Sequence, residues 1–306
     1  MAAQPTASLA ALSTVTPTPS AKPAAPAPKS ISDLLALPAD DLAKVDIAVM
    51  NLLCAKDLPG SEDLDIEAIT KKLDEWAARV KAETDKYYPR FLRNPAENNN
   101  SEADFRMLTL VSVLQLDLGV HYNMARVDQP DFKNSKDLFI HGVVGSDNGG
   151  TCVSLPVLYI AIGRRLGYPL KLVLAREHTF VRWDGNGERL NIEGSGRGMN
   201  TYPDEHYRSW PHPIKDEWVQ SGEFLTSLTP QGELADFLAS RGHCLNDIGR
   251  LANARQCYEA AAMLNPKLQA YRHFIAVNEA FEAHRKAGGK TALKLPADPY
   301  GERNEP

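Results

Sequence analysis

Residues 149–156 read Gly-Gly-Thr-Cys-Val-Ser-Leu-Pro and lead directly into the apolar run Val157–Ile162. The glycines free the backbone ahead of the cysteine, whereas a proline is tolerated only in the first turn of a helix. The stretch therefore predicts a loop that turns into a buried helix, which begins no earlier than Thr151 or is capped by Ser154. Either start places Cys152 at the N-terminal end, where unpaired N–H groups and the helix dipole favour a thiolate nucleophile.

Three strands are predicted after this helix. Gly167 is a typical helix stop, and Leu170–Ala175 and His178–Asp184 then carry strand-forming residues. The tetrapeptide Asp184-Gly185-Asn186-Gly187 is a strong hairpin signal before a third strand, Arg189–Glu193.

The hairpin is expected to bring a polar side chain to His178. If Gly185-Asn186 forms the turn, His178 faces Glu193, and if Asp184-Gly185 forms it, His178 faces Asn191. The two candidates share a face of the strand because they are two residues apart. A catalytic triad follows in which Cys152 is the nucleophile, His178 the base, and Glu193 or Asn191 the group that orients the base.

The alternative is that Cys152 and His178 are structural. The glycine-rich approach, the hairpin and the chain order favour the catalytic interpretation. The other cysteines, Cys54, Cys244 and Cys257, lie in helical, apolar or alanine-rich contexts and are predicted to be core residues. No CxxC pair is present, so the spacing indicates neither a zinc site nor a disulfide framework.

Composition limits the classes of function. The chain has 306 residues, 43% of them hydrophobic, which is enough for one large or two modest domains with a buried core. The net charge is −5 and no long basic run occurs, so nucleic acid is not an expected partner. No apolar stretch approaches the roughly 20 residues that span a bilayer, so no membrane partner is expected. Residues 1–30 are rich in Ala and Pro and lack the pattern of a signal peptide, which predicts a disordered tail on a cytoplasmic protein.

Helices are predicted on both sides of the central region 121–228. In 31–120, apolar residues at helical spacing indicate helices over Asp40–Cys54, from Ser61 to a stop at Pro89, and from a Ser101 cap to Gly119. The irregular segment that follows contains His121 and His141, both interpreted as structural. Phe139-Ile140 and Val143-Val144 predict either a short strand or a packed approach to the cysteine loop.

The region 229–286 resembles a tetratricopeptide unit. Its small, aromatic and proline positions predict a helical pair followed by a helix over Gln269–His284; these positions are Leu238, Gly242, Leu245, Ala254, Tyr258, Ala261 and Pro266. One unit cannot form a solenoid, so packing on the core is favoured over binding of a protein partner. Residues 287–306 are predicted to be a flexible end.

The central motifs resemble the transglutaminase-like core, a papain-related fold with Cys, His and Asp in this order. The resemblance lies in Gly150-Thr151-Cys152 before an apolar helix, in His178–Trp183 and in Leu190–Glu193. Arg164–Pro169 and the flanking helices are similar to the SirB-type bacterial branch. The resemblance covers about residues 31–283, and its motifs are dense only from 149 to 198.

This resemblance implies an α+β fold in which a central helix packs on an antiparallel sheet, with flanking helical regions. It implies that Cys152 is the nucleophile and His178 the general base, and that Glu193 stands where the family usually has an aspartate. Members of the branch can lack the cysteine, so its presence here argues for catalysis. An oxyanion hole needs the Cys152 N–H and a second donor, for which Asn123, Asn134 and Asn148 are the candidates.

The expected function is cysteine-dependent acyl transfer on an amide of a peptide or protein, by hydrolysis or transamidation through a thioester. The alternative is a non-catalytic scaffold or interaction protein. No metal or organic cofactor is implied.

Overall fold

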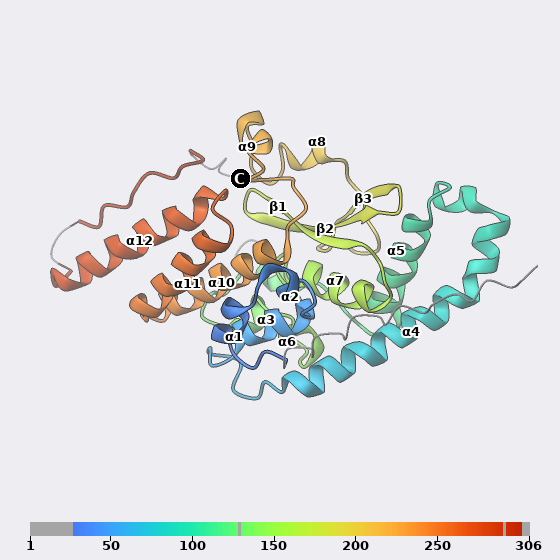
Figure 1. Cartoon of the computed structure of the whole chain (residues 1–306), viewed down its shortest axis with the longest axis horizontal. Coiled ribbons are helices and arrows are strands. Elements are labelled where there is room, and N and C mark those ends of the chain that lie inside the picture. The colour runs from blue at the N-terminus through green and yellow to red at the C-terminus, as the bar shows by residue number, and fades with distance from the viewer. Residues whose placement is uncertain (1–26, 128–129, 290–291, 302–306) are drawn as a thin grey trace, which may run out of the picture.

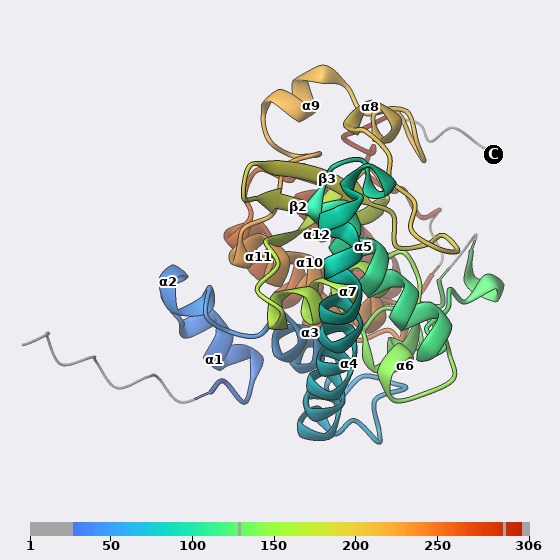
Figure 2. The ribbon, with the colours of Figure 1, turned by 90° about the vertical axis from the view of Figure 1, so that its right-hand side faces the viewer.

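The computed structural model describes residues 27–127, 130–289 and 292–301 (Figure 1). Most of the predicted disordered tail therefore lies outside the described residues. Over the described parts of the chain, helices surround a three-stranded antiparallel sheet of order β1-β2-β3. The sheet lies between α8 and α9 on one side and the main helical layer on the other (Figures 1 and 2). The predicted α+β class is confirmed.

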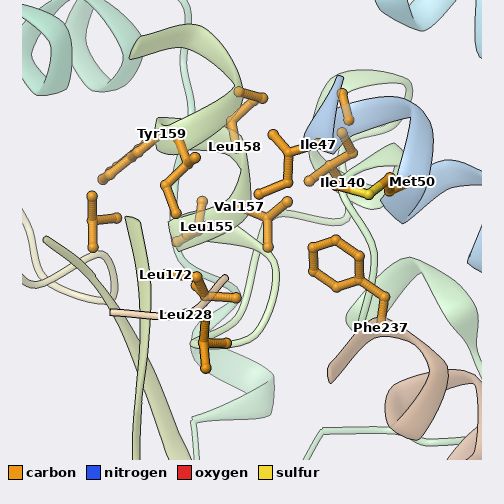
Figure 3. Packing of buried hydrophobic residues seen from close by; sticks show 14 of the residues in the cluster. Ile47, Met50, Ile140, Leu155, Val157, Leu158, Tyr159, Leu172, Leu228 and Phe237 are labelled. Atoms are coloured by element: carbon orange, nitrogen blue, oxygen red, sulfur yellow. The ribbon is translucent and has the colours of Figure 1, made fainter. Parts of the chain in front are cut away.

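The predicted cysteine helix is the centre of the core. This helix, α7, spans Leu155–Arg165, and every residue from Leu155 to Gly163 is buried. Pro156 lies in its first turn, where its missing N–H costs no helical hydrogen bond. One side of α7 packs on the sheet, and the other packs on helices from both ends of the chain (Figure 3). An apolar surface on nearly every side of α7 explains this position.

The sheet has the predicted strands but neither predicted register. The strands are β1 Leu170–Ala175, β2 His178–Gly185 and β3 Glu188–Ile192. The turn is Asn186-Gly187, with φ of 58° and 79°, the pair of positive values that a tight two-residue hairpin requires. It lies beyond both predicted turns, so Asn191 pairs with Arg182 rather than with His178.

The first front helix is divided. The predicted Asp40–Cys54 helix is two helices, α2 Ala39–Leu42 and α3 Ile47–Ala55, after a short α1 at Ile31–Ala36. Asp46 caps α3 by accepting a hydrogen bond from Ala48 N at 2.8 Å, and this local bond replaces helix continuation.

The second front helix passes the proline that was predicted to end it. Helix α4 spans Ile66–Arg93 and contains Pro89. The extra turn is stabilised because Phe91 is buried and stacks on Phe105 at 4.9 Å between ring centroids. A 3₁₀ turn, η1 Pro95–Asn98, follows it.

The third front helix has its predicted cap, since Ser101 Oγ accepts from Asp104 N at 2.9 Å. It comprises α5 Glu102–Ser112 and a π-helical turn, η2 Val113–Asp117.

In the described residues of the segment before the cysteine loop, the helical elements are short turns. They are η3 Met124–Arg126, η4 Ser135–Asp137 and α6 His141–Val144. The strand alternative for Phe139–Val144 is therefore wrong, and the packed approach is what the structure has. His141 accepts or donates one hydrogen bond with Ser135 Oγ at 3.1 Å, and burial lowers its pKa to about 4. These features fit the structural interpretation of His141.

The C-terminal helices pack on the core. After α8 Asp204–Tyr207 and α9 Asp216–Gln220 come α10 Pro230–Asp247, α11 Leu251–Leu264 and α12 Gln269–Lys286. Gly242 permits close contact between α10 and α11, since a Cβ there would lie 2.4 Å from the Tyr258 ring.

Helix α10 also contacts the front half. Arg241 donates to the carbonyls of Cys54 and Lys56 at the end of α3, at 2.8 and 2.6 Å. Among the described residues, no helix combines the length and apolarity needed to cross a membrane.

The region predicted as a flexible end includes a packed segment. Tyr300 is buried, and its hydroxyl donates to Glu223 Oε2 at 2.9 Å. Gly301 O accepts from Arg176 at 2.7 Å. The Tyr300 ring packs against Trp218 and Phe224 and so orders residues 298–301. The charge and proline content of this segment do not predict such a contact.

Candidate active site

The cysteine loop is fixed by its own side chains. Thr151 N donates to Ser154 Oγ at 3.0 Å, and Leu155 N donates to Thr151 O at 3.0 Å. Ser154 occupies the N-cap position, but its hydroxyl serves the loop rather than the helix N-terminus. Cys152 is half-buried immediately before α7, as predicted, and its carbonyl accepts from Thr179 Oγ1 of β2 at 2.5 Å. The thiol is thus tied to the strand that begins with His178.

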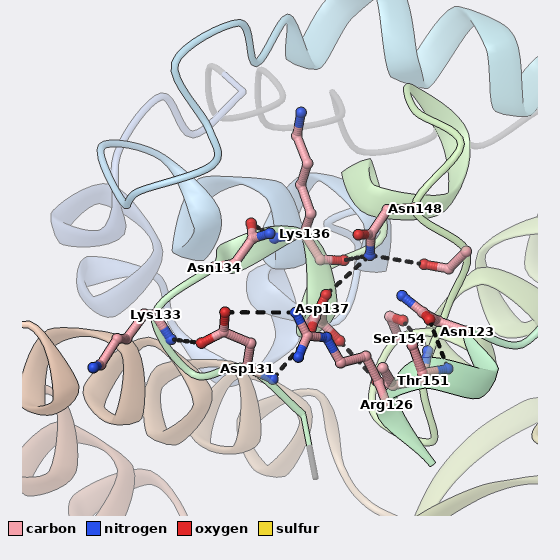
Figure 4. Close-up of polar contacts among 12 residues, drawn as sticks. Asn123, Arg126, Asp131, Lys133, Asn134, Lys136, Asp137, Asn148, Thr151 and Ser154 are labelled. Atoms are coloured by element: carbon pink, nitrogen blue, oxygen red, sulfur yellow. Dashed lines mark hydrogen bonds and ion pairs between the residues drawn. The ribbon is translucent and has the colours of Figure 1, made fainter.

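A buried carboxylate supports this loop from behind (Figure 4). Asp137 is fully buried, and its oxygens accept from Arg126 Nε at 2.8 Å, Asp131 N at 2.9 Å and Asn148 Nδ2 at 3.0 Å. Its backbone carbonyl accepts from Thr151 Oγ1 at 2.7 Å. The irregular segment and the cysteine loop therefore form one hydrogen-bonded unit.

Replacing Asp137 by Asn should lower the free energy of unfolding by about 1–3 kcal/mol, because an amide cannot accept all three donors. Urea unfolding followed by circular dichroism measures the loss. The control is Asp63→Asn, whose side chain is 76% exposed and 3.9 Å from Lys136. Equal, small effects of both changes would contradict the role given to Asp137.

His178 and Glu193 are in direct contact. His178 Nε2 lies 2.8 Å from Glu193 Oε2. The side chain of His178 is 4% exposed and that of Glu193 is 5% exposed. The Cys152 side chain also lies near the ring and contributes to its raised pKa. Because Nε2 faces the carboxylate, Nδ1 is the nitrogen left for the thiol. The imidazole therefore lies between Cys152 and Glu193.

Glu193 reaches His178 although the strand ladder does not pair them. The ladder ends at Ile192, and Glu193 then pairs with Asn200, donating its N–H to Asn200 O at 2.8 Å. The carboxylate accepts two bonds from Ser195, from N at 2.9 Å and from Oγ at 2.6 Å, and one from Tyr207 at 3.1 Å. These bonds hold a buried charge in a single orientation.

The environment stabilises a charged pair. Burial disfavours the charged form of His178, but hydrogen bonds to Cys152 and Glu193 outweigh it and raise the pKa of His178 to about 9. Burial likewise opposes charge on Glu193, yet bonds from His178 and Ser195 hold its pKa below the ordinary value. An imidazolium beside the thiol is therefore favoured at neutral pH.

One family model matches the part of the chain that holds these residues. The model of the transglutaminase-like superfamily matches residues 67–234, which is more than half of the chain. The chain belongs to the transglutaminase-like superfamily. No curated protein and no solved structure gives a significant match. The superfamily match begins in α4 and ends in α10, so it contains Cys152, His178 and Glu193.

Aromatic side chains enclose the histidine of this transglutaminase-like domain. Trp210 packs edge-on against His178, with ring centroids 4.7 Å apart, and Tyr207 lies nearly parallel to His178 at 6.2 Å. Tyr207 in turn stacks on Phe180 at 3.8 Å. Trp210 is 41% exposed and lies between His178 and solvent. A substrate can therefore also contact its ring.

Asn191 has a different set of partners. Its Oδ1 accepts from Arg182 Nε at 2.7 Å, and its Nδ2 donates to Tyr202 O at 3.0 Å and to Asp204 Oδ1 at 2.8 Å. The hairpin register explains this placement, because it sets Asn191 opposite Arg182. Asn191 therefore fixes the outer part of the hairpin, while Glu193 contacts the imidazole.

The three asparagines considered for the oxyanion hole bond to other groups. Asn134 Oδ1 accepts from Lys136 N at 3.1 Å, and Asn123 Oδ1 accepts from Ala125 N at 3.1 Å. Asn148 is committed to the Asp137 cluster described above.

Sequence reasoning missed Tyr122. Its hydroxyl lies close to both the backbone amide and the side chain of Cys152. The only sequence signal is an isolated tyrosine in a polar segment. Its proximity depends on a single parallel bridge between Tyr122 and Gly150, which no local pattern encodes.

Proposed function

We propose that this protein is a cysteine-dependent acyl-transfer enzyme that acts on an amide of a peptide or protein. The observation that carries the proposal is the position of His178 between the Cys152 side chain and Glu193. A thiol, an imidazole and a carboxylate in this order are the parts of a triad in which the base activates the nucleophile and the acid orients the base. Membership of the transglutaminase-like superfamily supports the same chemistry.

The reaction follows from these roles. The Cys152 thiolate attacks the amide carbonyl, His178 protonates the departing amine, and a thioester remains on Cys152. Water or a second amine, deprotonated by His178, then attacks the thioester and restores the thiol. Hydrolysis and transamidation differ only in this second nucleophile.

We also propose a SirB-type branch, a tetratricopeptide-like tail and a cytoplasmic location. The Arg164–Pro169 motif and the flanking helices support the SirB-type branch, and the α10–α11 contact at Gly242 supports a tetratricopeptide-like tail. We place the catalytic core at residues 121–228. A reducing compartment such as the cytoplasm would keep Cys152 as a thiol.

Alkylation by iodoacetamide, with the modified residue identified by mass spectrometry, tests the proposal. At pH 6 we expect Cys152 to react about 10- to 100-fold faster than free cysteine, because an imidazolium stabilises the reactive thiolate. The other thiols are internal controls, since burial raises the pKa of Cys54, Cys244 and Cys257. His178→Ala should remove the advantage.

A Cys152 that reacts no faster than free cysteine, in a protein whose cellular role survives Cys152→Ala, would exclude the enzyme. The scaffold function would then be favoured, with α10–α12 as the surface for a protein partner.

A further inference from the structure

The segment 121–123 lies parallel to the glycine loop that precedes the thiol. Gly150 N donates to His121 O at 2.9 Å, and Asn123 N donates to Gly150 O at 2.7 Å. Gly149 has φ of 76°, and a Cβ there would lie 2.9 Å from the His121 ring nitrogen. Glycine therefore permits the close approach that fixes the backbone of Tyr122 beside the loop.

The Tyr122 side chain extends from this bridge to the nucleophile. It is half-buried, and its hydroxyl lies close to both the Cys152 amide and the Cys152 side chain. On the other side, the Cys152 carbonyl is held by Thr179. The cysteine is thus fixed between two elements, and one hydroxyl faces both of its reactive features.

The position of the Tyr122 hydroxyl matches the place where the acyl oxygen lies during the reaction. In a tetrahedral intermediate, the acyl oxygen is bonded to the carbon that sulfur attacks, and it accepts a hydrogen bond from the nucleophile's own N–H. The oxygen must therefore lie close to both the Cys152 amide and Sγ. The Tyr122 hydroxyl occupies this neighbourhood in the free protein.

We propose that Tyr122 donates the second hydrogen bond of the oxyanion hole, an inference that rests on the acyl-transfer function proposed above. The sulfur lone pair forms the C–S bond while the carbonyl π pair moves to oxygen, which accepts from Cys152 N–H and Tyr122 O–H. Return of that pair breaks the C–N bond, and the amine takes its proton from His178. Tyr122 keeps its own proton throughout.

The surroundings of Tyr122 suit a donor. Burial, followed by the neighbouring Cys152 side chain, raises the pKa of Tyr122 above its ordinary value, so the hydroxyl stays protonated through the working pH range. When the acyl oxygen arrives, it takes the place of the hydroxyl at the Cys152 amide.

The test compares two reactions of Cys152 in the Tyr122→Phe variant, acylation and alkylation. Acylation by p-nitrophenyl acetate builds charge on a carbonyl oxygen, and losing one donor should slow it by about 100-fold. Alkylation by iodoacetamide displaces iodide and builds no such charge, so its rate should change little. The matched control is Tyr258→Phe, which removes a buried hydroxyl that is 3.0 Å from His243 Nδ1 in the helical tail.

Unchanged or faster acylation in Tyr122→Phe would overturn the inference and identify the hydroxyl as a mere cap on the thiol. An equal fall of both rates would also overturn it, because the tyrosine would then only position Cys152. A wild-type protein that is alkylated but never acylated at Cys152 would overturn the acyl-transfer function itself, and this inference with it.

Discussion

Replacing Glu193 by Gln should lower the rate of acylation at Cys152 by about 10⁴-fold, the scale of loss when a triad carboxylate becomes an amide. Glutamine keeps the size of the side chain but removes the charge that faces His178 at 2.8 Å. Only the Cys152 side chain then offsets burial, which opposes a charged ring, so the pKa of His178 falls. The imidazolium that stabilises the thiolate is then less populated.

The pH dependence of the acylation rate should differ between the wild type and Glu193→Gln. In the wild type the pKa of His178 is raised to about 9, so the imidazolium, and with it the activity, should persist to that pH and decline above it. In Glu193→Gln the alkaline limb should move down to about pH 6.5, the ordinary histidine value, or below. Rates of acylation by p-nitrophenyl acetate between pH 5 and 10 measure the pH above which activity declines.

Asn191→Ala is the matched comparison, because Asn191 lies on the same strand but bonds to Arg182 and Asp204. We expect Glu193→Ala to cost more activity than Asn191→Ala, and only the former to move the alkaline limb. A limb that moved in Asn191→Ala and stayed in Glu193→Gln would show that the amide orients the histidine.

Replacing Arg182 by Met should cost about 3–5 kcal/mol of unfolding free energy, because two buried acceptors lose their donor at about 1–3 kcal/mol each. Arg182 is fully buried in β2 and donates to Asn191 Oδ1, Leu225 O and Asp204 Oδ1. Its removal leaves Asn191 Oδ1 and Leu225 O without this donor, whereas Asp204 Oδ1 keeps its bond from Asn191 Nδ2. Since Asp204 begins α8, which carries the Tyr207 that bonds Glu193, the change should also loosen the site.

Arg189→Met is the control for this prediction, because Arg189 lies 3.4 Å from the same Asp204 but is 57% exposed. Its loss should change the unfolding free energy by less than about 1 kcal/mol. Arg182→Lys keeps the charge but not the forked geometry and should fall between the two. Urea unfolding of the three variants would contradict the argument if Arg189→Met were the most destabilising.

The sequence allowed the α7 helix and the strands to be predicted because their signals are local. Glycines and a proline define the start of α7, and alternation with a Gly-Asn-Gly turn defines the hairpin. The turn position could not be predicted from these signals, since overlapping two-residue turns fit the same tetrapeptide, and the choice depends on which residues adopt positive φ. The contact of His178 with Glu193 was among the expectations, but it is made beyond the end of the ladder.

Contacts between distant segments could not be predicted from the sequence. The Asp137 cluster joins four short segments, and Tyr122 reaches Cys152 through one bridge. Neither has a periodic or compositional signature. The passage of α4 through Pro89 depends on the burial of Phe91 against Phe105, which is again a tertiary contact.

The bond between Arg241 and the end of α3 also determines when the protein can fold. The two partners are 187 residues apart, and at about 5–20 residues per second a ribosome needs about 10 to 40 s to synthesise that interval. Eight of the nine residues of α3 are buried in the finished protein. During synthesis the face of α3 that packs on α10 stays uncovered until α10 is made, so the nascent chain should depend on chaperones that shield this face.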